Sequence, residues 1–192
     1  MDLKTLCETQ GVSGREEPVR RMVYQECVKA FGMDAVTFDG LGSVLAVRAA
    51  KKPGKPRVML AAHMDEVGLL VVSATDDGLL RFRAIGGIDA RVLVSKRVRV
   101  GYDTPEKPSL QGVIGAMAIH QQTPEDRKAV LPIDQLYIDI GAKDKAEAEK
   151  LAPAGTQVTF DTPFTPFGEN CLLAKALDDG LIRDAAVAQT KA

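Results

Sequence analysis

Hydrophobic residues follow a helical period at the start of the chain. "GVSG" at 11–14 separates a short first helix from a longer second one. The apolar positions of the second helix recur every three or four residues: Val19, Met22, Val23, Cys27, Ala30 and Phe31. Pro18 fits only the first turn of a helix, so we expect the helix to start near Glu16 or Glu17 and to end at Gly32.

From Ala35 the period shortens to that of strands. Three short β-like runs are separated by "GLG" and "KKPGKP": "AVTFD" (35–39), "SVLAVRA" (43–49) and "RVMLAAHMD" (57–65). "VMLAA" at 58–62 is apolar without alternation, which is typical of a strand covered on both faces. The pattern predicts a sheet between helices, with His63 and Asp65 emerging from the carboxyl end of a strand, where α/β folds gather their ligands.

The segment from 67 to 162 has a different texture. It holds six short strand candidates with frequent turn signals, which indicates a small β-barrel or sandwich. One helix is expected at 143–152, where strong helix formers are followed by "PAG". We expect a partial α/β domain at 1–66 and 163–192, with "PFTPFGEN" (163–170) as a connection, and an inserted β-barrel domain at 67–162.

Composition narrows the function classes. The net charge is −1, tryptophan is absent and aromatic residues are 5%, so neither nucleic acid nor an anionic membrane is an expected partner. No stretch approaches the roughly 20 apolar residues that span a membrane. The N-terminus has no apolar signal segment, and three widely separated cysteines favour reduced thiols. These features predict a cytoplasmic protein.

The first candidate site is the H-x-D pair His63 and Asp65. Residues two apart in an extended segment face the same side, so both groups can enter one cleft. Imidazole and carboxylate together suit zinc, cobalt or manganese. The alternative is a hydrogen-bonded histidine beside an acid with no metal, because so short a motif is common.

The second candidate is "KALDD" at 175–179, where Asp178 and Asp179 follow an apolar run. Adjacent residues of a regular strand face opposite ways, so at most one of them is expected in the cleft of His63. A carboxylate can bridge two cations, as in two-metal hydrolases. The alternative is an exposed turn with two solvated acids.

Other candidate residues give weaker evidence for a functional site. His120 is the only other histidine and is expected to be an ordinary residue at a strand end. Glu66 could act as a base, but in a regular strand it points away from Asp65. No G-x-S-x-G motif and no phosphate-binding glycine loop is present.

The combination of motifs resembles the cytosolic metallo-aminopeptidases of the glutamyl, deblocking and tetrahedral aminopeptidase group. The resemblance runs in order over roughly residues 5–179: "GVSGREEPVR", "FDGLGSVLA" with Ser43 in the usual asparagine place, "MLAAHMDEVGLLV", "AIGG", "GVIGAMAIH", "LYIDIGA" and "KALDD". "AHMDEVG" followed by "KALDD" is the specific part.

The resemblance implies a zinc-peptidase-like α/β domain with an inserted barrel, and a homo-oligomer. His63 would bind one divalent metal (zinc, cobalt or manganese), Asp65 would act in catalysis by orienting His63, and Asp178 would bridge two metals. The implied reaction is hydrolysis of the N-terminal peptide bond of a peptide substrate by a metal-held water.

The chain departs from the family after the bridging aspartate, where Asp179-Gly180 replaces the family's D-R. Family members continue there with the general-base glutamate, further acidic ligands and a final histidine, so the chain is expected to be truncated after "KALDD". The two expected direct ligands, His63 and Asp178, are fewer than the roughly three protein ligands of a catalytic zinc.

Two main hypotheses follow. The first is a metal-dependent aminopeptidase whose remaining ligands and base come from elsewhere. The second is a non-catalytic fragment that acts only as an oligomerising β domain. A third is a glycosidase that uses Asp65 and Asp178 as acid and base, and metal dependence of any activity would separate it from a peptidase.

Overall fold

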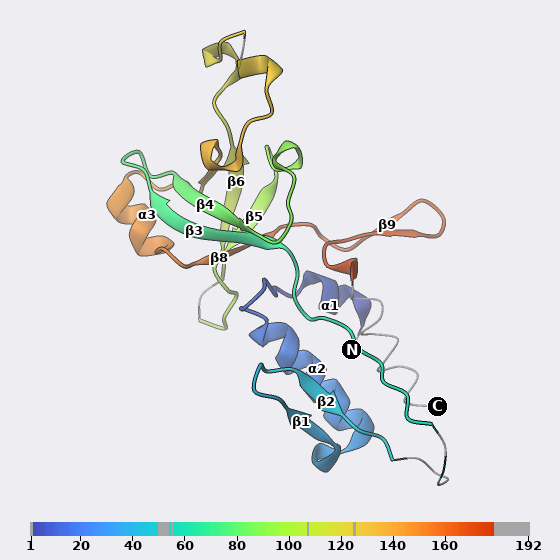
Figure 1. Cartoon of the computed structure of the whole chain (residues 1–192). Coiled ribbons are helices and arrows are strands. Elements are labelled where there is room, and N and C mark those ends of the chain that lie inside the picture. Colours follow the sequence, from blue (N-terminus) through green and yellow to red (C-terminus); the bar gives the residue numbers. More distant parts are fainter. Residues whose placement is uncertain (1, 50–53, 55, 107, 125, 179–192) are drawn as a thin grey trace. The chain divides into compact units, whose positions relative to one another are not determined.

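The computed structural model describes residues 2–49, 54, 56–106, 108–124 and 126–178 (Figure 1). The chain divides into two compact units. The first unit comprises Met1–Gly11, Glu16–Asp65 and Pro163–Ala192, and the barrel unit comprises Val12–Arg15 and Glu66–Thr162.

The first unit begins with two helices, as the hydrophobic period predicts. α1 spans Leu3–Glu8 and is capped by the side chain of Asp2, which accepts a hydrogen bond from the Thr5 backbone amide. α2 spans Glu17–Phe31 with a proline in its first turn, and it ends at Gly32, whose φ of 89° suits glycine. Both predicted ends of α2 are confirmed.

A two-stranded hairpin packs on α2 (Figure 1). A short 3-10 turn, Met33–Ala35, leads into β1 (Val36–Phe38), which pairs antiparallel with β2 (Val44–Ala46). The contact is a small apolar cluster of residues from the helix and both strands: Val23, Tyr24, Cys27, Val28, Phe31, Val36 and Val44. The two predicted strands are confirmed, although each is shorter than its apolar run.

The run "VMLAA" differs from its prediction. Residues 58–62 belong to no strand or helix, and the side chains of Val58 and Met59 are 84% and 86% exposed. The expected strand, covered on both faces in a sheet between helices, is therefore wrong for the described part of the chain, whose first unit holds only two-stranded sheets. Lack of alternation shows that both faces are apolar, but it does not show what covers them.

The last described segment of the first unit is a second hairpin rather than a plain connection. β9 (Thr165–Phe167) pairs antiparallel with β10 (Cys171–Leu173), so the expectation for 163–170 is corrected. All six strand residues are exposed. The turn lies between them, and Gly168 has a φ of 61°.

The barrel unit is a closed six-stranded barrel in the order β3-β4-β7-β6-β5-β8, which confirms the predicted barrel. Its strands are β3 Gly68–Ala74, β4 Leu80–Ile85, β5 Arg97–Val100, β6 Leu110–Gly115, β7 Tyr137–Asp139 and β8 Gln157–Phe160. α3 (Lys145–Leu151) confirms the predicted helix and is capped by Asp144. The described residues of the unit also form four 3-10 turns: η2 Ala90–Val92, η3 Ile119–Gln121, η4 Asp126–Lys128 and η5 Ile133–Gln135.

The barrel interior is the main hydrophobic core. Alternate residues of each strand point inward, among them Leu69, Phe82, Val98 and Ile138, all nearly or fully buried. The outward residues are polar or half-exposed, as the alternation in "RFR" and "RVRV" predicts. No helix of the described residues is long and apolar enough to cross a membrane.

Candidate metal centre

His63 and Asp65 are joined side chain to side chain. Nδ1 of His63 lies 2.9 Å from Oδ1 of Asp65 and 3.0 Å from the Asp65 backbone oxygen. Both neighbours of Nδ1 are acceptors, which favours the tautomer with its proton on Nδ1 and its lone pair on Nε2. The pair therefore presents Nε2 as a ligand atom.

Asp178 lies on the other side of the same ring. Its Oδ1 is 3.6 Å from Nε2 of His63. Two ligand atoms of a tetrahedral metal with bonds of about 2.0–2.1 Å lie about 3.3 Å apart, so this separation is close to that of two ligands sharing one ion. The Asp178 side chain is 93% exposed, which leaves its second oxygen open to another partner.

The segment that carries Asp178 is anchored on α1. Nζ of Lys175 donates a hydrogen bond of 2.8 Å to the backbone oxygen of Thr9, the C-terminal cap of α1. Sγ of Cys7 lies 3.8 Å from the backbone oxygen of Ala176. Ala176 itself has a φ of 53°, a left-handed conformation that side chains rarely adopt. These contacts fix the approach of the chain to Asp178.

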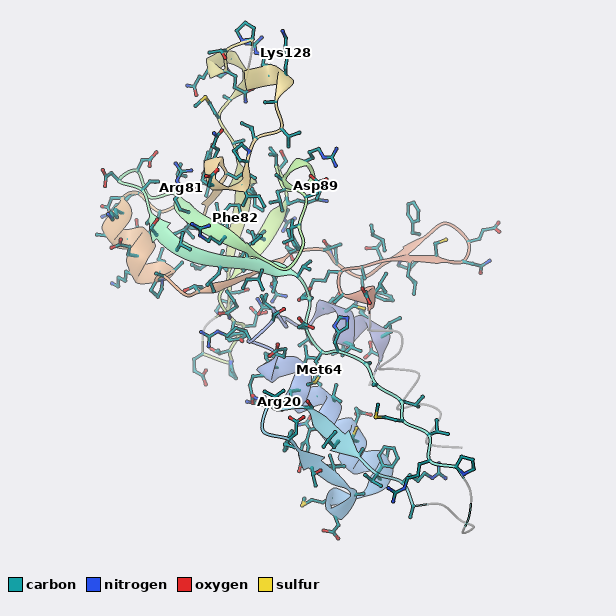
Figure 2. The ribbon with its side chains drawn as sticks, in the orientation of Figure 1. Arg20, Met64, Arg81, Phe82, Asp89 and Lys128 are labelled. Atoms are coloured by element: carbon teal, nitrogen blue, oxygen red, sulfur yellow. The ribbon has the colours of Figure 1, made fainter. Side chains whose placement is uncertain are left out.

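Close packing also fixes the segment that carries His63 and Asp65. Met64, labelled in Figure 2, stands between them, and its backbone oxygen would lie 3.2 Å from a Cβ placed on Gly11. The same Cβ would lie 2.7 Å from Cγ2 of Val19 on α2. Only glycine permits this approach at position 11, which gives the first glycine of "GVSG" a role in placing His63.

Sequence reasoning found the three polar groups but missed the groups that place them. Lys175 stands inside "KALDD" and Gly11 inside "GVSG", yet neither spacing nor residue type shows which backbone they contact. The side chain of Cys7, which contacts the segment that carries Asp178, is buried. Contacts between positions 7 and 176, or 9 and 175, are set by the tertiary fold.

The remaining candidates lie elsewhere. His120 is exposed in the 3-10 turn η3 that follows β6, rather than at the strand end itself. Glu66 forms an isolated parallel bridge with Val12 in the barrel unit. Asp179 lies outside the described residues.

The described donors fit part of a metal site. Nε2 of His63 and the carboxylate of Asp178 are suitable ligands for a divalent ion, and Asp65 holds the imidazole in the manner usual for metal-bound histidines. Within the residues that the structure describes, no group of three or more histidine, cysteine, aspartate or glutamate side chains is placed to hold a metal. The described residues therefore offer two of the ligands that a metal site needs.

The motifs that resemble those of metallo-aminopeptidases thus lie on a mixed α/β chain with a closed barrel. Comparison with known families supports this. The model of the M42 glutamyl aminopeptidase family matches residues 42–185, and the chain belongs to this family.

Individual relatives support the same family assignment. The chain is 36% identical over 181 residues to the FrvX protein of Escherichia coli K12, a match over 92% of this chain and 48% of that protein. It is 34% identical to the lysyl aminopeptidase of Pyrococcus furiosus, over 92% of this chain and 50% of the relative. The chain spans about half the length of the curated relatives it matches.

Solved structures share the fold. The TET1 peptidase of Pyrococcus horikoshii, described as assembling into a tetrahedron or a large octahedral shell, superposes with a TM-score of 0.81 at 34% identity. The match covers 98% of this chain and 54% of that one. The mixed α/β fold with its six-stranded barrel is thus that of solved aminopeptidases.

Proposed function

We propose that this chain carries one part of the catalytic centre of a metal-dependent aminopeptidase, which hydrolyses N-terminal residues from peptides. His63 and Asp178 would bind the divalent metal, and Asp65 would orient His63. The observation that supports this most strongly is the His63 ring held between two carboxylates, at 2.9 Å from Asp65 and 3.6 Å from Asp178.

Each residue has a defined chemical task. The Asp65 carboxylate would accept a hydrogen bond from Nδ1–H of His63, which fixes the tautomer and turns the Nε2 lone pair toward Asp178. Asp178 offers one oxygen to the position shared with His63, while its exposed second oxygen can meet another cation. A bound zinc, cobalt or manganese ion would supply polarisation of the scissile carbonyl and activation of water.

Hydrolysis needs more than these groups. A catalytic zinc takes about three protein ligands, and a general base must reach the attacking water. His63 and Asp178 supply two ligands, so we propose that further ligands and the base lie outside the described residues. The alternative function is a non-catalytic, oligomerising β domain. The assemblies described for the TET1 peptidase support homo-oligomer formation under either function.

A comparison of two proteins tests the proposal. The 192-residue chain, given zinc, cobalt or manganese, should hydrolyse amino-acid p-nitroanilides no faster than its His63→Ala variant. A fusion to the part of the lysyl aminopeptidase that the match does not cover should hydrolyse them, and His63→Ala should abolish that activity. A soluble, metal-loaded fusion whose activity is unchanged by His63→Ala would refute the assignment.

A further inference from the structure

The outer face of the barrel unit contains a cavity of about 570 Å³ that the aminopeptidase chemistry does not use. It is lined by residues of β3, β4 and η5: Val72, Arg81, Phe82, Arg83, Ala84, Ile133 and Asp134. Its volume lies in the range of pockets that take small ligands, about 300–1,000 Å³. Figure 2 marks Arg81 and Phe82 on β4, from which most of the lining comes.

Two irregularities of the barrel create this cavity. β4 and β7 are registered at a single pair, Leu80 with Ile138, so that the strands part beyond Leu80 and η5 lies beside β4 instead. On the other side of β4, the register with β3 shifts between Val71 and Ser73, which makes Val72 the extra residue of a bulge. Bulges re-aim side chains, and Val72 is turned to the exposed outer surface.

The two arginines of the cavity differ in their hydrogen bonds. Arg81 and Arg83 alternate with the buried Phe82, so both lie on the outer face of β4. Nη1 of Arg81 donates hydrogen bonds to the backbone oxygens of Leu136, at 3.2 Å, and Asp134, at 3.5 Å. Arg81 therefore closes the seam where β4 and β7 part, and its role is structural.

Arg83 and Asp134 are the charges left for a ligand. In the described part of the chain, the Arg83 guanidinium has no hydrogen bond or ion pair, and the same holds for the Asp134 carboxylate. Both residues are exposed. The cavity thus presents one guanidinium and one carboxylate without partners among the described residues, beside the apolar side chains of Val72 and Ile133, while the charge of Arg81 is held against backbone oxygens.

A cation, an anion and apolar side chains together favour a ligand that is a zwitterion with an apolar group. A guanidinium binds a carboxylate through two parallel hydrogen bonds, and a carboxylate binds an ammonium group. A phosphate dianion would gain from Arg83 but would be repelled by Asp134, so the pair disfavours a simple anion. A purely apolar ligand would leave both charges unpaired.

We propose that the cavity binds a short peptide with free termini, its carboxylate on Arg83, its ammonium group on Asp134 and an apolar side chain against Val72 and Ile133. The site lies wholly within the barrel unit and uses none of the residues of the metal centre. It would place a second peptide-binding site, for substrate or product, on the barrel. The proposal does not depend on catalysis.

Nuclear magnetic resonance of the ¹⁵N-labelled chain, with EDTA present so that no metal contributes, tests this site. The probe is the dipeptide Ala-Leu, compared with its C-terminal amide and with its N-acetyl form. Ala-Leu should shift the amides of Val72, Arg83 and Asp134 and leave that of His63 unmoved. Each blocked form should bind at least tenfold more weakly. These ligand comparisons use the unmodified chain and need no variant to fold.

Variants assign the two charges. Arg83→Gln should weaken Ala-Leu at least tenfold, whereas the matched control Lys96→Gln, an exposed charge outside the cavity, should leave binding unchanged. Asp134→Asn should weaken Ala-Leu tenfold but leave the N-acetyl form unaffected, with Asp76→Asn as its control.

Three results would overturn the proposal. The first is an absence of shifts at the cavity with millimolar Ala-Leu. The second is equal binding of the dipeptide and its amide, which would remove the role of Arg83. The third is inorganic phosphate binding there more tightly than Ala-Leu, which would show an anion site. None of these results bears on the metal centre, because EDTA is present throughout.

Discussion

His63 and Asp65 form a hydrogen-bonded pair, with 2.9 Å between Nδ1 and Oδ1, and this pair turns the other ring nitrogen toward Asp178. Under the proposed function, this relationship would let Asp65 orient His63 without direct contact to a metal. Glu66, the other acid of "HMDE", belongs to the barrel unit and forms a parallel bridge with Val12.

Replacement of Asp65 tests this function. Asp65→Asn should lower the affinity of the chain for cobalt or zinc by about 10–100-fold, because the imidazole loses its charged acceptor and its fixed tautomer. Titration of cobalt, followed by absorption, measures the affinity. Asp161→Asn is the control, since it removes a carboxylate that pairs with Arg97 in the barrel unit. Equal affinities for Asp65→Asn and the unmodified chain would contradict the role of Asp65.

The exposed apolar run at 58–62 predicts that the chain associates with itself. Val58, Met59 and Leu60 are consecutive exposed apolar side chains on a segment outside any strand or helix, a surface that promotes contact with other molecules. Met59→Lys should reduce self-association of the chain, measured by light scattering during size-exclusion chromatography. Val113→Lys, at an exposed valine of β6, should change association less. A monomer with slow hydrogen exchange across residues 57–62 would show that the run is covered.

Much of the fold could be predicted from the sequence, because its signals are local. The 3.6-residue period gave α2, glycine marked its end, and alternation with frequent turns gave the barrel. The prediction failed at "VMLAA", where an apolar run has no alternation to report its surroundings. It also failed for the β9–β10 hairpin, because "PFTPF" has the prolines of a loop.

The residues of the candidate site could be predicted from the sequence, but the contacts that hold them in place could not. "HMD" and "KALDD" named His63, Asp65 and Asp178, because few residue types serve as metal ligands. The contacts that place these groups, such as Lys175 with Thr9, join positions 166 residues apart and leave no local signal. The cavity beside β4 depends on a bulge and a parted seam, which no periodicity reveals.

Alanine substitutions at two glycines of the barrel unit distinguish the cost of a steric clash from the cost of backbone strain alone. Gly78 and Gly101 have φ values of 85° and 84°, so an alanine at either position is strained. A Cβ at Gly78 would overlap the backbone oxygen of Ala142, whereas one at Gly101 would lie 3.9 Å from Thr156. Gly78→Ala should destabilise the barrel by about 3 kcal/mol and Gly101→Ala by about 1 kcal/mol. Urea denaturation measures both, and equal losses would contradict the account of the clash.

Lowering the pH should reduce the stability of the first unit, because Glu26 becomes protonated. The pKa of Glu26 is lowered from its ordinary 4.5 to about 2, and the hydrogen bond from Lys29 is the largest cause. The folded chain then binds this proton less readily than the unfolded chain, so the stabilisation is present above pH 4.5 and is lost as the pH falls toward 2. Solvent at the exposed Lys29 limits its size to about 1 kcal/mol.

The variant Glu26→Gln isolates this effect. At pH 6 the unmodified chain should be more stable than the variant, and the difference should shrink steadily between pH 4.5 and 2. Chemical denaturation at several pH values gives the difference at each step. A constant difference over this range would show that the ionisation of Glu26 contributes nothing to stability.

The most direct test of the metal centre is a zinc titration followed on the histidine ring nitrogens by ¹⁵N nuclear magnetic resonance. The chain has two histidines, so His120 serves as an internal reference for His63. Zinc should shift Nε2 of His63, leave its Nδ1 protonated toward Asp65, and leave His120 unchanged, and Asp178→Asn should weaken the response. An unshifted His63, or equal shifts of both histidines, would contradict the assignment of His63 as a metal ligand.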